Sequence, residues 1–177
     1  FEFSTNEKVA TEVAFGAALN GNLSCVFFKS VGLNVAADSF VQLAHMEVPG
    51  GLVIVLGDDP GANSSQNEQD NRHYARFSYT PMMEPASPAD AYAMFLEAAR
   101  FSREKRMPIM IRMTTHVCHA KERVTFGPWD PQTVPAGKPF DPSMGGPWIP
   151  IGRNVPLMKR RALHKLEEAA EWAENSP

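Results

Sequence analysis

Residues 50–72 read GGLVIVLGDDPGANSSQNEQDNR, a buried-strand pattern that runs directly into a long polar segment. Five consecutive apolar residues rich in β-formers, bounded by glycines, are typical of a strand covered on both faces of a parallel sheet. The sixteen residues 57–72 that follow have almost no hydrophobic anchor. In open α/β sheets, binding sites usually lie where apolar strands end in polar loops. The sequence therefore predicts a central parallel strand that leads into a functional loop.

The sequence on both sides of this strand alternates between helical and strand patterns. Asn6 and Ser87 are suitable helix N-caps, and Pro88 follows Ser87 at a first helical position. Helices are predicted over residues 7–19, 32–44, 71–77 and 88–105, and strands over 23–28, 52–56, 81–83 and 108–113. This alternation predicts an α/β fold, with a parallel sheet, right-handed crossovers and helices on both faces. It does not give the order of the strands in space.

Three regions follow from composition and pattern. Residues 1–126 form the predicted α/β domain, and its first strand is expected to be missing because a helix signature begins at Thr5-Asn6 without a preceding strand. Residues 127–154 are expected to be extended, since 127–152 contain seven of the fifteen prolines and five glycines. Residues 155–177 are expected to form a docked amphipathic helix and a linker to a following domain. Its predicted inward side chains are Met158, Leu163, Leu166, Ala170 and Ala173.

Charge and composition restrict the classes of partner. The formal net charge is -3 and no basic block occurs, so binding to nucleic acid or to an anionic membrane is not predicted. No apolar run is long enough for a membrane span, and the N-terminal residues lack a signal-peptide pattern, so a cytoplasmic location is expected. Cys25 and Cys118 are expected to be free thiols.

Several collinear segments carry a resemblance to a known family. They are Asn6-Glu7-Lys8-Val9-Ala10, the segment 29–38 (KSVGLNVAAD), Asp58-Asp59-Pro60-Gly61 followed by residues 64–70 (SSQNEQD), and Thr114-Thr115. Together they resemble the α subunit of indolepyruvate:ferredoxin oxidoreductase, in the 2-oxoacid:ferredoxin oxidoreductase superfamily. The resemblance implies the pyrimidine-binding domain of a thiamine-diphosphate-binding fold.

The resemblance also implies an activity, which is oxidative decarboxylation of a 2-oxoacid to an acyl-CoA with ferredoxin as the acceptor. Thiamine diphosphate is the expected cofactor, with its Mg²⁺ held by another domain and no metal bound here. Iron-sulfur clusters and CoA are expected only in the complete enzyme. The expected partners are the diphosphate-binding domain of the same subunit, a second subunit and ferredoxin, and self-association through apolar surface is also expected.

Some alternatives remain open at this point. Indolepyruvate or related arylpyruvates are the expected substrates, and pyruvate or another 2-oxoacid is the alternative. A non-catalytic binding or assembly module is a second alternative. The isolated chain is expected to be inactive in either case.

By resemblance, Glu7 is the catalytic glutamate that binds N1′ of the aminopyrimidine, where a shared proton favours the reactive tautomer. The alternative is a first-turn glutamate that only complements the helix dipole, and Glu12 is assigned no catalytic role. The turn that contains Val31, Gly32, Leu33 and Asn34 is expected to lie beside the cofactor, or else to be only a strand-to-helix turn.

The polar loop supplies the remaining candidate residues. The family's most distinctive segment matches Ser64, Ser65, Gln66, Asn67, Glu68, Gln69 and Asp70, and some of these are expected near substrate or the partner domain. A solvated surface loop is the alternative. The run His116-Val117-Cys118-His119 is not predicted to bind metal, because a distant fourth ligand is missing. The family usually has arginine where His116 stands, which weakens an anion-binding role there.

Overall fold

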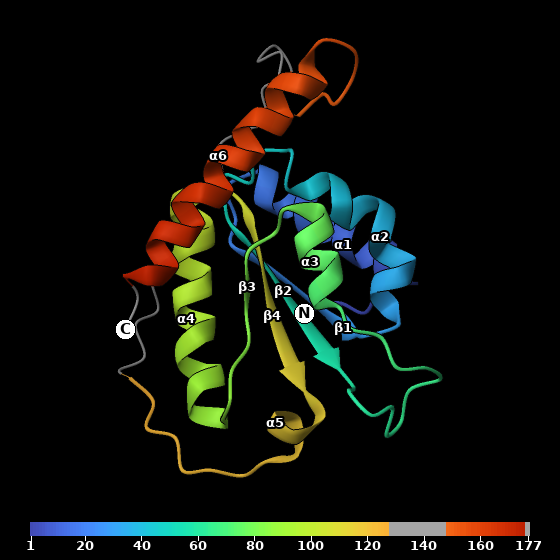
Figure 1. Cartoon of the computed structure of the whole chain (residues 1–177), viewed down its shortest axis with the longest axis vertical. Helices are drawn as coiled ribbons and strands as arrows, with labels where there is room; N and C mark the ends of the chain where they lie inside the picture. The colour runs from blue at the N-terminus through green and yellow to red at the C-terminus, as the bar shows by residue number, and fades with distance from the viewer. Residues whose placement is uncertain (128–147, 176–177) are drawn as a thin grey trace.

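The computed structural model describes residues 1–127 and 148–175 and contains a four-stranded sheet in the order β1-β2-β4-β3. All three strand pairs are parallel, and Leu52 at the start of β2 is in register with Ser24 on β1 and with Pro108 on β4. The strands are β1 (Ser24–Lys29), β2 (Leu52–Asp58), β3 (Met82–Met83) and β4 (Pro108–Thr114) (Figure 1). The predicted parallel α/β fold is confirmed, with the strand at 52–58 inside the sheet.

Helices follow the strands as the sequence predicts. Asn6 caps the first helix by accepting a hydrogen bond from the Val9 amide at 2.9 Å, and Ser87 accepts one from the Asp90 amide at 3.1 Å. The short helix over 115–119 was not predicted. The helices are α1 (Glu7–Leu19), α2 (Gly32–Leu43), α3 (Arg72–Ser78), α4 (Pro88–Lys105), α5 (Thr115–His119) and α6 (Asn154–Glu174).

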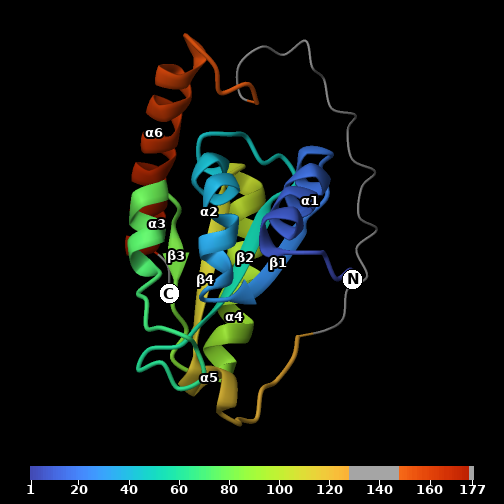
Figure 2. The same cartoon turned by 90° about the vertical axis from the view of Figure 1, so that its right-hand side faces the viewer.

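Alternation along β2 divides the core into two layers. Leu52, Ile54 and Leu56 belong to one buried cluster with side chains of α1, α2 and α3, whereas Val53 belongs to a second cluster with side chains of α4 and α6. This alternation reflects the period of two along a strand. In Figure 2, α1 and α2 lie in front of the sheet and α4 lies behind it. The sheet is therefore covered on both faces.

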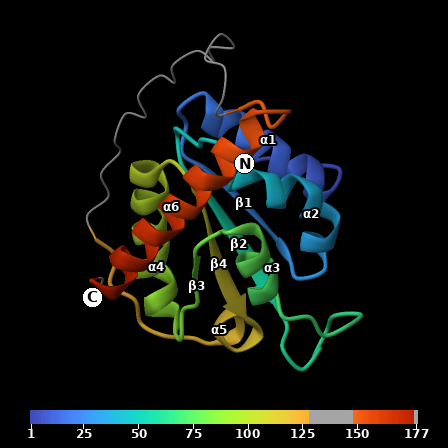
Figure 3. The same ribbon diagram turned by 45° about the horizontal axis from the view of Figure 1, so that its top comes forward.

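Helix α6 lies against α4 (Figure 3), with a face that matches the prediction only in part. Its buried side chains are Met158, Ala162 and Ala169, and Leu163 is exposed. The orientation follows from two contacts. Trp172 packs against Phe101 with ring centroids 4.6 Å apart, and the Lys165 ammonium pairs with Glu47 at 2.9 Å. These contacts with other elements, rather than the leucine positions, determine which face docks.

Parts of the C-terminal prediction lie outside the described residues. The segment 127–154, which was expected to be extended, lies mostly outside the described residues.

Within 1–127 and 148–175, no helix combines the length and the hydrophobicity needed to cross a membrane. Cys25 and Cys118 are free thiols, as expected.

Candidate functional site

Glu7 is the first residue of α1, and its side chain lies directly over Gly32 at the start of α2. A Cβ atom at Gly32 would lie 2.6 Å from Glu7 Cγ and 2.9 Å from Glu7 Oε1, which is closer than real contacts allow. Only glycine therefore leaves room for this carboxylate position. Within α1, the buried Thr11 hydroxyl donates to the Glu7 carbonyl oxygen one turn earlier, at 2.8 Å.

Some residues of the predicted turn 31–34 lie in the core and others face the polar loop. Gly32 and Leu33 are buried, and Leu33 packs in the core beneath α2. Val31 occupies the N-cap position of α2 without a side-chain capping bond. Asn34 is exposed and points toward the polar loop, where its Nδ2 donates to Gln69 Oε1 at 2.9 Å. Gly32 of this turn contacts Glu7, and Asn34 contacts the polar loop. The structure thus brings the three predicted segments together.

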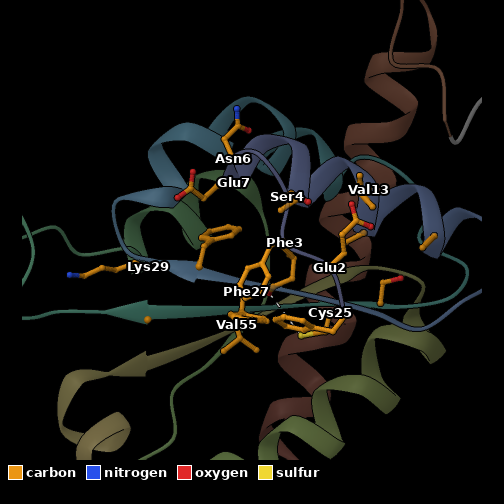
Figure 4. A pocket seen from close by; sticks show the side chains of 18 of the residues that line it. Glu2, Phe3, Ser4, Asn6, Glu7, Val13, Cys25, Phe27, Lys29 and Val55 are labelled. Atoms are coloured by element: carbon orange, nitrogen blue, oxygen red, sulfur yellow. Dashed lines mark hydrogen bonds between the residues drawn. The ribbon is translucent and has the colours of Figure 1, made fainter.

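A cavity of about 860 Å³ extends from Glu7 along the free edge of β1. Figure 4 shows Glu7 and Lys29 toward one end of this cavity and Val13 toward the other, with Phe27 between them. Val13 and Phe27 are exposed, 49% and 59% respectively. The carboxylate of Glu7 therefore borders a largely apolar space.

The polar loop is held in one shape by Asp59. Its carboxylate accepts from the amides of Ser64 at 2.7 Å and Ser65 at 2.9 Å, and from the Thr115 hydroxyl at 2.7 Å. These bonds favour the charged form, so the Thr115 hydrogen bond first and the Ser64 amide second hold the pKa of Asp59 far below its ordinary value. The loop also reaches β1, because the Lys29 ammonium donates to the Ser64 carbonyl oxygen at 2.8 Å.

A buried ion pair lies beneath the loop at the carboxyl ends of β2 and β4. Arg112 Nε donates to Asp58 Oδ2 at 2.5 Å, and Arg112 Nη1 donates to Glu84 at 2.6 Å. Both the Arg112 and the Asp58 side chains are almost fully buried, 4% and 0% exposed. Burial lowers the pKa of Arg112, but its bonds to Asp58 and Glu84 outweigh that effect and raise the pKa above the ordinary value. The Arg112 guanidinium therefore remains charged.

The predicted loop residues have different environments. Gln69 donates to the Ser30 carbonyl oxygen at 2.9 Å, Glu68 accepts from the Gly61 amide at 3.1 Å, and Asp70 pairs with Arg72 at 2.8 Å. The Arg72 hydrogen bonds lower the pKa of Asp70 to about 2. Gln66 and Asn67 are exposed and free of side-chain hydrogen bonds within the described part of the chain. Two predicted loop residues reach the turn at 30–34: Gln69, through its bond to Ser30, and Ser65, whose hydroxyl lies 3.5 Å from the Ser30 hydroxyl.

Sequence reasoning assigned no role to Asp58, Asp59, Lys29 or Arg112. A usable signal was present, since Arg112 stands inside the apolar strand 108–113, and a charge in a buried strand needs a partner. The acidic pair at the end of β2 could supply that partner. Within residues 1–127 and 148–175, no cluster of three or more His, Cys, Asp or Glu side chains could hold a metal ion.

Fold and site together define a class. A parallel α/β sheet with polar side chains gathered at the carboxyl ends of its strands is typical of domains that bind a cofactor or small molecule at that edge. Residues 4–175 match the family model described as "Pyruvate flavodoxin/ferredoxin oxidoreductase, thiamine diP-bdg". The chain belongs to this family, in agreement with the resemblance found in its motifs.

Curated relatives support the same assignment. The chain is 41% identical over 176 residues to indolepyruvate oxidoreductase subunit IorA of Methanothermobacter marburgensis, and 40% identical over 182 residues to the subunit of that name from Thermococcus kodakarensis. Each match covers 99% of this chain and 28% of the relative. The chain therefore spans little more than a quarter of the length of these relatives.

A solved structure supports the fold independently. The 2-oxoglutarate:ferredoxin oxidoreductase from Magnetococcus marinus superposes with a TM-score of 0.65 at 13% identity, over 95% of this chain and 36% of that chain. At this identity the superposition establishes the fold alone. The expected thiamine-diphosphate-binding fold is thus supported by the family model and by the structure.

Proposed function

We propose that this chain is the pyrimidine-binding part of a thiamine-diphosphate-dependent 2-oxoacid:ferredoxin oxidoreductase, and that Glu7 is its catalytic residue. The observation that carries the proposal is the contact between Glu7 and Gly32, in a chain whose family model is thiamine-diphosphate-binding. A glutamate that only complemented a helix dipole would not require a glycine on the neighbouring helix. The bare Cα of Gly32 keeps the carboxylate at the mouth of the cavity.

The residues present fit one end of the cofactor. Glu7 offers a carboxylate that can share a proton with a ring nitrogen of the aminopyrimidine, and the turn at 31–34 offers backbone close to that carboxylate. Thiamine diphosphate, when bound, supplies the carbanion chemistry that decarboxylation of a 2-oxoacid requires. Glu7 would hold and move one proton at the border of a largely apolar cavity.

Among the described residues, no cluster of three or more His, Cys, Asp or Glu side chains could hold the Mg²⁺ of the diphosphate end. We assign that end to a second domain of the same subunit, as the greater length of the relatives allows. Iron-sulfur clusters, CoA and ferredoxin are assigned to the complete enzyme in the same way. Half of a binding interface provides little affinity, so we expect the isolated chain to bind thiamine diphosphate weakly and to have no turnover. Indolepyruvate or a related arylpyruvate is the proposed substrate, because the relatives with 40–41% identity carry that name.

The experiment that tests the proposal is Glu7→Gln in the enzyme assembled from full-length subunits. An amide still reaches the ring nitrogen but cannot share a proton as a carboxylate does. We expect kcat to fall by about two to four orders of magnitude, with the fold retained.

Glu12→Gln is the matched control, because Glu12 lies on the same helix and accepts from the Ser39 hydroxyl at 2.8 Å, away from Gly32. Its kcat should remain near that of the unaltered enzyme. Near-normal turnover of Glu7→Gln would refute the catalytic role. Steady-state kinetics with indolepyruvate, pyruvate and 2-oxoglutarate in parallel would identify the substrate.

A further inference from the structure

The side chain of Gln69 connects the polar loop to the turn between β1 and α2. Its Nε2 donates to the Ser30 carbonyl oxygen at 2.9 Å and to Asn71 Oδ1 at 2.8 Å, and its Oε1 accepts from Asn34 Nδ2 at 2.9 Å. Ser30 and Asn71 are buried, 1% and 0% exposed. The Gln69 amide therefore forms hydrogen bonds with backbone and side-chain groups of two segments, the turn at 30–34 and the end of the polar loop at Asn71.

This amide belongs to a hydrogen-bond relay that begins at the buried ion pair. Asn71 Nδ2 donates to Asp58 Oδ1 at 2.8 Å, and Asp58 in turn pairs with Arg112. An ionised carboxylate can only accept hydrogen bonds, so Asn71 must turn its amide nitrogen toward Asp58. Its oxygen then faces Gln69, which must donate there. The charge on Asp58 thus fixes the orientation of both amides and leaves Gln69 Oε1 as the acceptor for Asn34.

This series of hydrogen bonds ends close to Gly32, against which the Glu7 side chain lies. Ser30, which accepts from Gln69, stands two residues before Gly32, and the Gly32 Cα lies against the Glu7 side chain. Asn34, the other residue held by Gln69, lies in the first turn of α2. The Gln69 side chain thus joins the loop to the turn beneath Glu7, beside the Lys29–Ser64 and Ser30–Ser65 contacts, although 62 residues separate Glu7 from Gln69 in the sequence.

We propose that Gln69 is a positioning residue for thiamine diphosphate, which holds the turn at 30–34 and thereby the surface on which Glu7 rests. This inference rests on the proposed function. It does not require Gln69 to touch the cofactor, because its effect is transmitted through Ser30 and Asn34. The loop and the cofactor site are then connected by continuous hydrogen bonds, which begin at the buried Asp58–Arg112 pair.

The test is Gln69→Glu in the assembled enzyme, with thiamine diphosphate and Mg²⁺ as the titrated ligand. The substitution preserves shape but replaces the Nε2 donor by an oxygen that repels the Ser30 and Asn71 oxygens. We expect the dissociation constant for the cofactor to rise by about tenfold or more, with kcat at saturating cofactor also reduced. Gln69→Met removes the hydrogen bonds without adding charge and should raise the same dissociation constant.

Gln42→Glu is the matched control, because it makes the same chemical change at an exposed position near the end of α2. Its cofactor affinity should equal that of the unaltered enzyme. If the unaltered enzyme does not bind the cofactor, the proposed function is wrong. If it binds but Gln69→Glu and Gln69→Met bind within about twofold of it, the positioning role is wrong. Unfolding of both variants would make Gln69 a purely structural residue and would also overturn the inference.

Discussion

Replacing Gly32 by alanine should reduce kcat while leaving the stability of the fold nearly unchanged. The added Cβ would lie 2.6 Å from Glu7 Cγ, whereas ordinary contact begins at 3.4 Å, so the Glu7 side chain must retreat by about 0.8 Å. The backbone itself accepts alanine, because Gly32 is not among the residues with positive φ. The strain therefore falls on the flexible carboxylate, not on the helix.

The expected result is a stable but slow enzyme. Alanine is a better helix former than glycine by roughly 0.5–1 kcal/mol, so the free energy of unfolding should change by less than about 1 kcal/mol. A displacement of this size at a proton-sharing group should reduce kcat on the order of 100-fold. Urea unfolding of the chain and steady-state kinetics of the assembled enzyme measure the two quantities.

Gly16→Ala provides the control within α1. A Cβ atom at Gly16 meets nothing within 4 Å, so this variant should gain up to about 1 kcal/mol of stability and leave kcat unchanged. The reasoning would be refuted if Gly32→Ala retained the kcat of the unaltered enzyme. It would also be refuted if Gly16→Ala lost activity to the same extent, because helix stiffening would then explain both.

Two further predictions concern the groups at the carboxyl edge of the sheet. The pKa of Asp59 is lowered in the folded state, so its contribution to stability is present above about pH 4, the unfolded pKa, and is lost as the pH falls toward the folded value. Asp59→Asn should therefore lower the urea midpoint at pH 7 more than at pH 3, and an equal loss at both pH values would contradict this. Arg112→Met leaves the Asp58 carboxylate buried without its partner and should cost about 3–5 kcal/mol in denaturant unfolding. Adding Asp58→Asn should recover part of that loss, and no recovery would show that the pair is not the cause.

The helix boundaries could be predicted because their signals are local. Asn6 and Ser87 accept hydrogen bonds from amides three residues later, so a short window of sequence contains everything that starts α1 and α4. The helix at 115–119 was missed because its five residues give no periodic pattern. The docking face of α6 was predicted only in part, because Trp172 and Lys165 find their partners, Phe101 and Glu47, far away in the sequence.

The candidate site was predicted only as separate segments. Glu7, the turn at 31–34 and the loop at 64–70 could be named from their motifs, and the family match confirms the resemblance that linked them. The sequence did not show that Gly32 lies beneath Glu7 or that Gln69 joins the loop to the turn. It also did not reveal Asp59 as the anchor of that loop, since its bonds to Asn63, Ser64 and Ser65 depend on how the loop folds back and its bond to Thr115 depends on the position of α5.

The sequence by itself determined the α/β class, the limits of most elements and the family, because hydrophobic periodicity, caps and collinear motifs are properties of adjacent residues. The tertiary structure decided the strand order β1-β2-β4-β3 and the contacts across it. Arg112 meets Asp58, 54 residues away, only because β4 pairs with β2 in one register. A slip of one residue would turn every side chain of β4 to the opposite face, and that choice is made by packing on both faces of the sheet.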